Sequence, residues 1–189
     1  LVAGGLTTTG VPLEPAGTMT YHELFEIYTE QITALAEAGA DLLVVETMLG
    51  IDEMTVALEA AQSVCALPVL CSMTVQADGS GYFGGTCVEA VETLQELGAA
   101  AVGINCSTGP DQLESLVRNM KQAAKVPLLV KPNAGMPEIS PEGEAIYSMG
   151  PAAFAQYMRT LIDAGAALVG GCCGTDPRYI SALRDVLPR

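Results

Sequence analysis

The chain has 189 residues, of which 50% are hydrophobic, and this is enough for one compact domain with a substantial core. Its formal net charge is -14, so nucleic-acid phosphates and anionic membrane surfaces would be repelled. No apolar stretch approaches the roughly 20 residues of a membrane span, and the N-terminus lacks the pattern of a secretory signal. We therefore expect a soluble, cytoplasmic protein with a single domain over residues 1–189 and a small-molecule partner.

Strand-like apolar runs alternate with helical patterns along the chain, which favours β–α units and a parallel sheet. Thr20 and Glu23 predict a capping box, followed by an apolar helix face that includes Ile27. Thr86 and Glu89 predict a second capping box. Three prolines suit the first turn of a helix, namely Pro110, Pro151 and Pro177. The predicted strands are 1–3, 41–46, 68–73, 100–105, 127–132 and 167–171.

The predicted strands are of two alternating kinds. Strands 41–46, 100–105 and 167–171 each follow a glycine that ends the preceding helix, whereas 68–73 and 127–132 each begin at a proline. Such alternation is typical of a (β/α)8 barrel, which takes about 250 residues and carries its chemistry at the carboxyl ends of its strands. We therefore predict an α/β protein with a TIM barrel that lacks its first two β–α units. An open doubly wound sheet is the alternative.

Four chemically active side chains fall near the ends of the strands that follow a helix-ending glycine: Glu46, Cys106, Cys172 and Cys173. The glycines around the paired cysteines permit the turn that adjacent thiols need if they are to converge. Three thiolates with one exchangeable position make an open zinc site. Zinc would hold a substrate thiol as thiolate at neutral pH, so alkyl transfer to sulfur is the predicted reaction. Buried structural thiols or a disulfide are the alternatives.

Two other side chains allow alternative interpretations. Lys131, at a strand end, could form a Schiff base in an aldolase-like site with Glu46 as acid or base, but this hypothesis leaves the three cysteines unexplained. Glu46 by itself could instead cap the next helix near Asp52. The remaining cysteines fall within or beside apolar patterns and are expected to be buried and inert: Cys65, Cys71 and Cys87.

Three motifs, in this order and spacing, closely resemble the homocysteine S-methyltransferase family. They are Gly-Ile-Asn-Cys-Ser at 103–107, Lys-Pro-Asn-Ala-Gly at 131–135 and Gly-Gly-Cys-Cys-Gly-Thr at 170–175. The resemblance covers essentially the whole chain. It implies a (β/α)8 barrel that holds zinc through Cys106, Cys172 and Cys173, with the sulfur of homocysteine as the exchangeable ligand.

The resemblance also implies roles for two further residues and for a methyl donor. Glu46 matches a carboxylate near the substrate amino group, and Asn133 matches a position that binds the amino-acid end. The motif at 131–135 looks most like the cobalamin-dependent methionine synthase branch, which implies methylcobalamin supplied by a separate corrinoid-carrying module. The betaine and S-methylmethionine branches are alternatives. Since the family's acidic first-strand segment has no match here, a non-catalytic zinc-binding fragment is a further alternative.

Overall fold

The computed structural model describes residues 1–187, which form a six-stranded parallel sheet and a separate two-stranded hairpin. The order of strands in the main sheet is β1-β2-β3-β4-β5-β8. All six predicted strands are present, and the largest shift in bounds affects the first of them. The strands are β1 (Ala3–Leu6), β2 (Leu42–Met48), β3 (Val69–Met73), β4 (Ala101–Asn105), β5 (Leu128–Lys131) and β8 (Ala166–Val169).

Within residues 1–187, five helices connect consecutive strands of the main sheet, and a sixth follows its last strand. They are α1 (Tyr21–Glu37), α2 (Ile51–Val64), α3 (Cys87–Glu96), α4 (Glu114–Ala123), α5 (Pro151–Asp163) and α6 (Pro177–Val186). Both predicted capping boxes are present, with Thr20 and Glu23 at the start of α1 and Thr86 and Glu89 at the start of α3. Two of the three prolines begin α-helices, whereas Pro110 begins the short 3-10 helix η1 (Pro110–Gln112).

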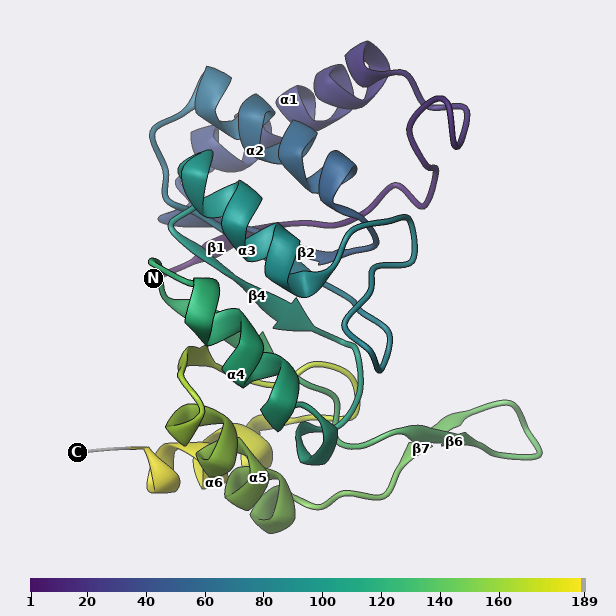
Figure 1. Ribbon diagram of the computed structural model, residues 1–189, viewed down its shortest axis with the longest axis vertical. Coiled ribbons are helices and arrows are strands. Elements are labelled where there is room, and N and C mark those ends of the chain that lie inside the picture. The colour runs from purple at the N-terminus through teal and green to yellow at the C-terminus, as the bar shows by residue number, and fades with distance from the viewer. Residues whose placement is uncertain (188–189) are drawn as a thin grey trace.

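The strand order decides between a barrel and a doubly wound sheet. Each strand of the main sheet pairs in parallel with the next one along the chain, so the order never reverses. Because crossovers between parallel strands are right-handed, a constant direction of winding places the connecting helices on one face. Figure 1 shows α2, α3 and α4 crossing in front of the sheet. A doubly wound sheet reverses direction at a switch point, so that alternative is wrong.

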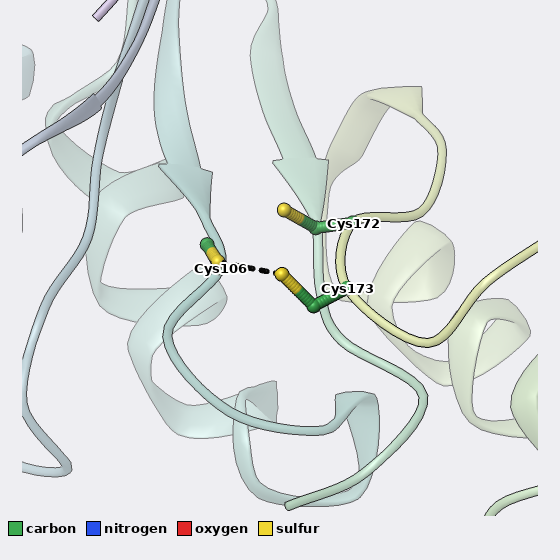
Figure 2. A group of neighbouring side chains, drawn as sticks. All are labelled: Cys106, Cys172 and Cys173. Atoms are coloured by element: carbon green, nitrogen blue, oxygen red, sulfur yellow. Dashed lines mark hydrogen bonds between the residues drawn. The ribbon is translucent and has the colours of Figure 1, made fainter. Parts of the chain in front are cut away.

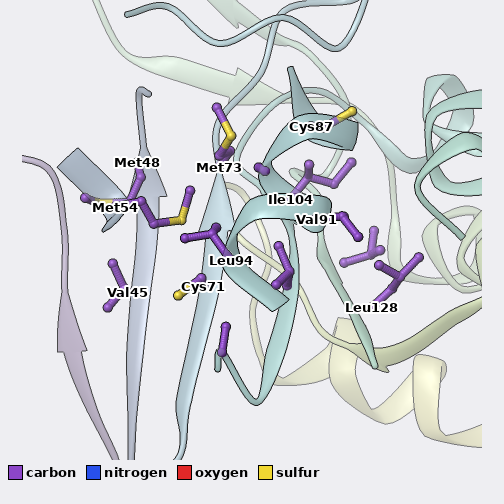
Figure 3. Packing of buried hydrophobic residues seen from close by; sticks show 14 of the residues in the cluster. Val45, Met48, Met54, Cys71, Met73, Cys87, Val91, Leu94, Ile104 and Leu128 are labelled. Atoms are coloured by element: carbon purple, nitrogen blue, oxygen red, sulfur yellow. The ribbon is translucent and has the colours of Figure 1, made fainter. Parts of the chain in front are cut away.

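The hydrophobic core lies between the sheet and its helices. In Figure 3, Val91 and Leu94 of α3 lie beside Cys71 and Ile104 of the strands, and all four are fully buried. Such interdigitation supplies the apolar burial that drives folding. Of the three cysteines expected in the core, two are buried, but Cys65 at the end of α2 is only partly so.

The buried stripe of α1 is narrower than its sequence pattern predicts. Leu24, Tyr28 and Ile32 are buried, while Ile27 is 43% exposed and the prediction that it faces the core is wrong. Ile27 is exposed because it lies on the flank of the helix, where it lines an open groove together with Val11 and several glutamates.

The hairpin of β6 (Pro137–Ile139) and β7 (Ala145–Tyr147) was not predicted from the sequence. Its strands have three residues each, and most of their side chains are exposed, so no apolar alternation marks them. The hairpin follows β5 and projects well beyond the sheet (Figure 1). None of the helices within residues 1–187 combines the length and the apolar character that a membrane crossing requires.

Candidate metal centre

Three cysteines from two distant parts of the chain converge at the carboxyl ends of the strands. Cys106 directly follows β4, and Cys172 and Cys173 lie in the turn between β8 and α6. Their Sγ atoms all lie within 4.8 Å of one another, and those of Cys106 and Cys173 are 3.4 Å apart (Figure 2). A tetrahedral zinc ion with Zn–S bonds of about 2.3 Å separates its sulfur ligands by about 3.8 Å. The donor set therefore fits a zinc ion with only small side-chain adjustments.

The backbone at the end of β5 and just after it holds both cysteine segments in place. The N–H of Cys106 donates to the carbonyl of Lys131 at 3.2 Å, and the N–H of Cys172 donates to the carbonyl of Pro132 at 2.9 Å. Cys106 itself has a φ of 53°, in the left-handed region that non-glycine residues seldom adopt. Such a conformation persists where surrounding contacts enforce it, and it turns the thiol out of the line of the strand.

Asn133 supports the paired cysteines from the same segment. Its side chain is buried, and its Oδ1 accepts a hydrogen bond of 3.2 Å from the N–H of Cys173. The carbonyl of Cys173 in turn accepts from the N–H of Ala134 at 2.9 Å. Asn133 thus orients the cysteine turn in this structure, and its role in binding an amino-acid substrate stays a prediction.

Asn105 is a buried polar residue at the site that the sequence-based interpretation did not include. Its Oδ1 accepts from the N–H of Thr47 at 2.9 Å and from the hydroxyl of Ser72 at 2.7 Å. Its Nδ2 donates to Thr47 Oγ1 at 2.8 Å and lies 3.8 Å from the Sγ of Cys172. A polar side chain ending an otherwise apolar strand was the available signal, because buried amides require partners. Asn105 therefore links β2, β3, β4 and the cysteine turn.

The thiols influence one another's ionisation. The pKa of Cys172 lies well below its ordinary value, chiefly because Cys106 donates a hydrogen bond to it and then because Asn105 does. The pKa of Cys106 is correspondingly raised by its hydrogen bond to Cys172 and by burial. Tyr147 of the hairpin lies close by, and its pKa is raised first by burial and then by the neighbouring Cys173. The hydrogen bonds around Cys172 thus favour its thiolate form.

Glu46 and Lys131 form an ion pair beside the cysteines. The Nζ of Lys131 donates to Oε2 of Glu46, and the two side chains are 23% and 34% exposed, respectively. The interpretation of Glu46 as a helix cap is wrong, because α2 begins after Gly50 without any side-chain cap. Glu46 also borders an open hollow of about 450 Å³, lined in addition by Thr47 and residues 7–9.

Replacing Asn105 by Ala is expected to weaken zinc binding by about 10- to 100-fold, the usual effect of removing a hydrogen-bonding neighbour of a ligand. It should also cost about 1–3 kcal/mol of stability for each partner left unsatisfied. Competition with a chromophoric chelator would measure the affinity. Asn119→Ala, on the exposed side of α4, is the matched control. Equal zinc affinities in the two variants would show that Asn105 does not support the site.

The fold and the site together define a class of protein: a β/α protein with a parallel sheet wound in one direction and three thiol donors at the carboxyl ends of its strands. The family model described as homocysteine S-methyltransferase matches residues 1–187, so the chain belongs to the homocysteine S-methyltransferase family.

The chain is also similar in sequence to two mycobacterial methionine synthases. The chain is 30% identical over 186 residues to a methionine synthase of Mycobacterium leprae, a match that covers 95% of this chain and 15% of that protein. The match to the methionine synthase of Mycobacterium tuberculosis is 31% identical over 177 residues, covering 90% and 15%, respectively. The chain therefore spans about 15% of the length of these curated relatives.

Solved structures of the homocysteine methyltransferase MmuM from Escherichia coli share the fold. The apo form matches with a TM-score of 0.80 and 26% identity, covering 99% of this chain and 63% of that one. The metallated form matches with a TM-score of 0.67, also at 26% identity, covering 85% and 51%, respectively. The predicted family is thus confirmed, and the parallel sheet corresponds to part of a barrel enzyme.

Proposed function

We propose that this chain binds zinc through Cys106, Cys172 and Cys173 and presents the thiol of homocysteine for methylation, which yields methionine. The observation that carries the proposal is the convergence of the three Sγ atoms within 4.8 Å at the strand ends of a homocysteine S-methyltransferase family member. A relative of the same family, MmuM, has been solved in a metallated form.

Each side chain at the site has a proposed task. When bound, zinc supplies a positive charge that keeps a substrate thiol in its thiolate form at neutral pH. The carboxylate of Glu46 binds the substrate ammonium, and Asn133 orients the cysteine turn and the amino-acid end of the substrate. In the reaction the substrate thiol loses its proton, a sulfur–methyl bond forms, and the bond between the methyl group and its donor breaks.

The proposed methyl donor is methylcobalamin, carried to the site by a separate corrinoid-carrying module. Support comes from the two mycobacterial relatives, which are methionine synthases and of which this chain covers only 15%. Assays with methylcobalamin, betaine and S-methylmethionine as alternative donors would identify the branch. Methionine formation with betaine alone would overturn the cobalamin proposal.

The proposed complete barrel contains two further β–α units between β8 and β1. The two edge strands of the sheet have no partner on their outer sides within residues 1–187. Apolar side chains are exposed at both edges, with Val2 just before β1 at 69% and Leu168 in β8 at 38%. Unpaired, apolar edges are normally covered, since they promote aggregation.

The decisive test of this function is the sulfur coordination of zinc before and after homocysteine is added. X-ray absorption of the zinc-loaded chain should show three sulfur ligands alone and four with homocysteine, because the thiol takes the exchangeable position. Methionine is the matched control ligand, since its methylated sulfur cannot become a thiolate. A shell that keeps three sulfurs in the presence of homocysteine would contradict substrate binding.

A further inference from the structure

Lys131 occupies a position that connects the cysteine segments to Glu46. It is the last residue of β5, and its backbone carbonyl accepts from the N–H of Cys106 at 3.2 Å. Its aliphatic stem lies beside Gly170, where an added Cβ would be 3.4 Å from Cγ and Cδ of the lysine. The ammonium group then reaches the carboxylate of Glu46 on β2. The backbone of Lys131 thus adjoins the segment of Cys106, and its side chain neutralises Glu46.

Among the described residues, Lys131 is the one cationic side chain that belongs to a strand of the sheet. The arginines in this part of the chain lie on α4, α5 and α6, and each pairs with a carboxylate within or beside its own helix. Lys121 lies in α4, and Lys125 follows that helix and precedes β5. With a net charge of -14, the protein has few ways to attract an anionic group to the thiols.

An amino-acid substrate brings two opposite charges into the site. Glu46 can compensate its ammonium but not its carboxylate, and a carboxylate that loses its hydration without a partner is unfavourable. Lys131 provides the missing charge, on the strand next to the one that precedes Cys106.

We propose that Lys131 is a specificity-determining residue that binds the α-carboxylate of the thiol substrate while Glu46 binds its ammonium. This inference rests on the proposed function and adds the group that selects amino-acid thiols over other thiols. In the free chain the lysine and the glutamate neutralise each other. A zwitterionic substrate enters between them and replaces one ion pair by two, whereas a thiol without the carboxylate leaves the lysine without a partner.

The test compares two thiols that differ only in the carboxylate, L-homocysteine and 3-aminopropane-1-thiol. Titration calorimetry on the zinc-loaded full chain should give homocysteine the tighter binding by about 10- to 100-fold, the range for hydrogen bonds to charged groups. Lys131→Met should bind the two thiols with about equal affinity, because the charge that selects homocysteine is gone. Lys131→Arg should keep it, because the charge remains. Lys125→Met, an exposed lysine outside the site, is the matched control and should behave as the original chain.

The outcomes separate this inference from the proposed function. If homocysteine does not bind the zinc-loaded original chain, the proposed function itself fails. If it binds but shows no preference over 3-aminopropane-1-thiol, the inference is overturned without any variant being needed. If Lys131→Met binds both thiols more tightly by the same factor and still prefers homocysteine, the lysine only competes with the substrate for Glu46. The inference is again overturned.

Discussion

Replacing Cys106 by Ala is expected to weaken zinc binding by about 100- to 1000-fold. Zinc binding to a four-ligand site releases roughly 10–16 kcal/mol, so one thiolate accounts for about 3–4 kcal/mol of it. The remaining thiols, Cys172 and Cys173, come from one turn and cannot surround the ion from both sides. Metal content after dialysis, together with chelator competition, would measure the loss.

The control for this prediction is Cys65→Ala. Cys65 lies at the end of α2, away from the site, and its thiol donates a hydrogen bond to the carbonyl of Ala61 at 3.4 Å. That variant should retain one zinc per chain, as is expected of the original protein. If Cys106→Ala also retained one tightly bound zinc, the assignment of Cys106 as a ligand would be wrong.

Replacing Gly103 by Ala is expected to destabilise the protein by about 3 kcal/mol or more, at the upper end of the cost of overpacking. An added Cβ would lie 1.7 Å from the carbonyl oxygen of Leu129, a backbone atom of the paired strand β5. A backbone atom cannot move aside without separating β4 from β5. Because these strands carry Cys106 and Lys131, zinc affinity should fall together with stability.

Gly5→Ala is the matched control for this substitution. Gly5 also lies in a strand, but an added Cβ there has no atom within 4 Å. The free energy of unfolding of Gly5→Ala should differ from that of the original chain by less than about 1 kcal/mol. Urea unfolding followed by circular dichroism would compare the midpoints. Equal midpoints for the two variants would contradict the close approach of β4 and β5.

Much of the fold follows from local patterns. Capping boxes such as Thr20 with Glu23 involve residues within one helical turn, so a short stretch of sequence is sufficient to predict them. Most of the parallel strands are likewise apolar runs that follow a helix-ending glycine or begin at a proline. The hairpin at 137–147 could not be predicted, because its short strands bury little and show no alternation.

The sequence predicts the three cysteines of the candidate site, but it does not predict the hydrogen bonds and the ion pair around them. Adjacent cysteines at a strand end, with a third at an equivalent position, identify a thiolate site from residue type and spacing alone. The contacts of Asn105 join residues 58 and 67 positions apart in the chain, and no local pattern specifies them. Glu46 and Lys131 are 85 positions apart in the chain; their places at strand ends predict that they lie at one edge of the sheet, but only the structure shows their ion pair.

By itself, the sequence determined the six strands of the main sheet, its family resemblance and the three thiols that would hold a metal. Only the tertiary structure decided that the strands keep one direction of winding, which excludes a doubly wound sheet. It also decided that Lys131 reaches Glu46 beside the thiols rather than facing solvent. The physical reason is that turns and periodicity depend on neighbours in the chain, whereas ion pairs and buried hydrogen bonds depend on which strand ends the folded sheet brings together.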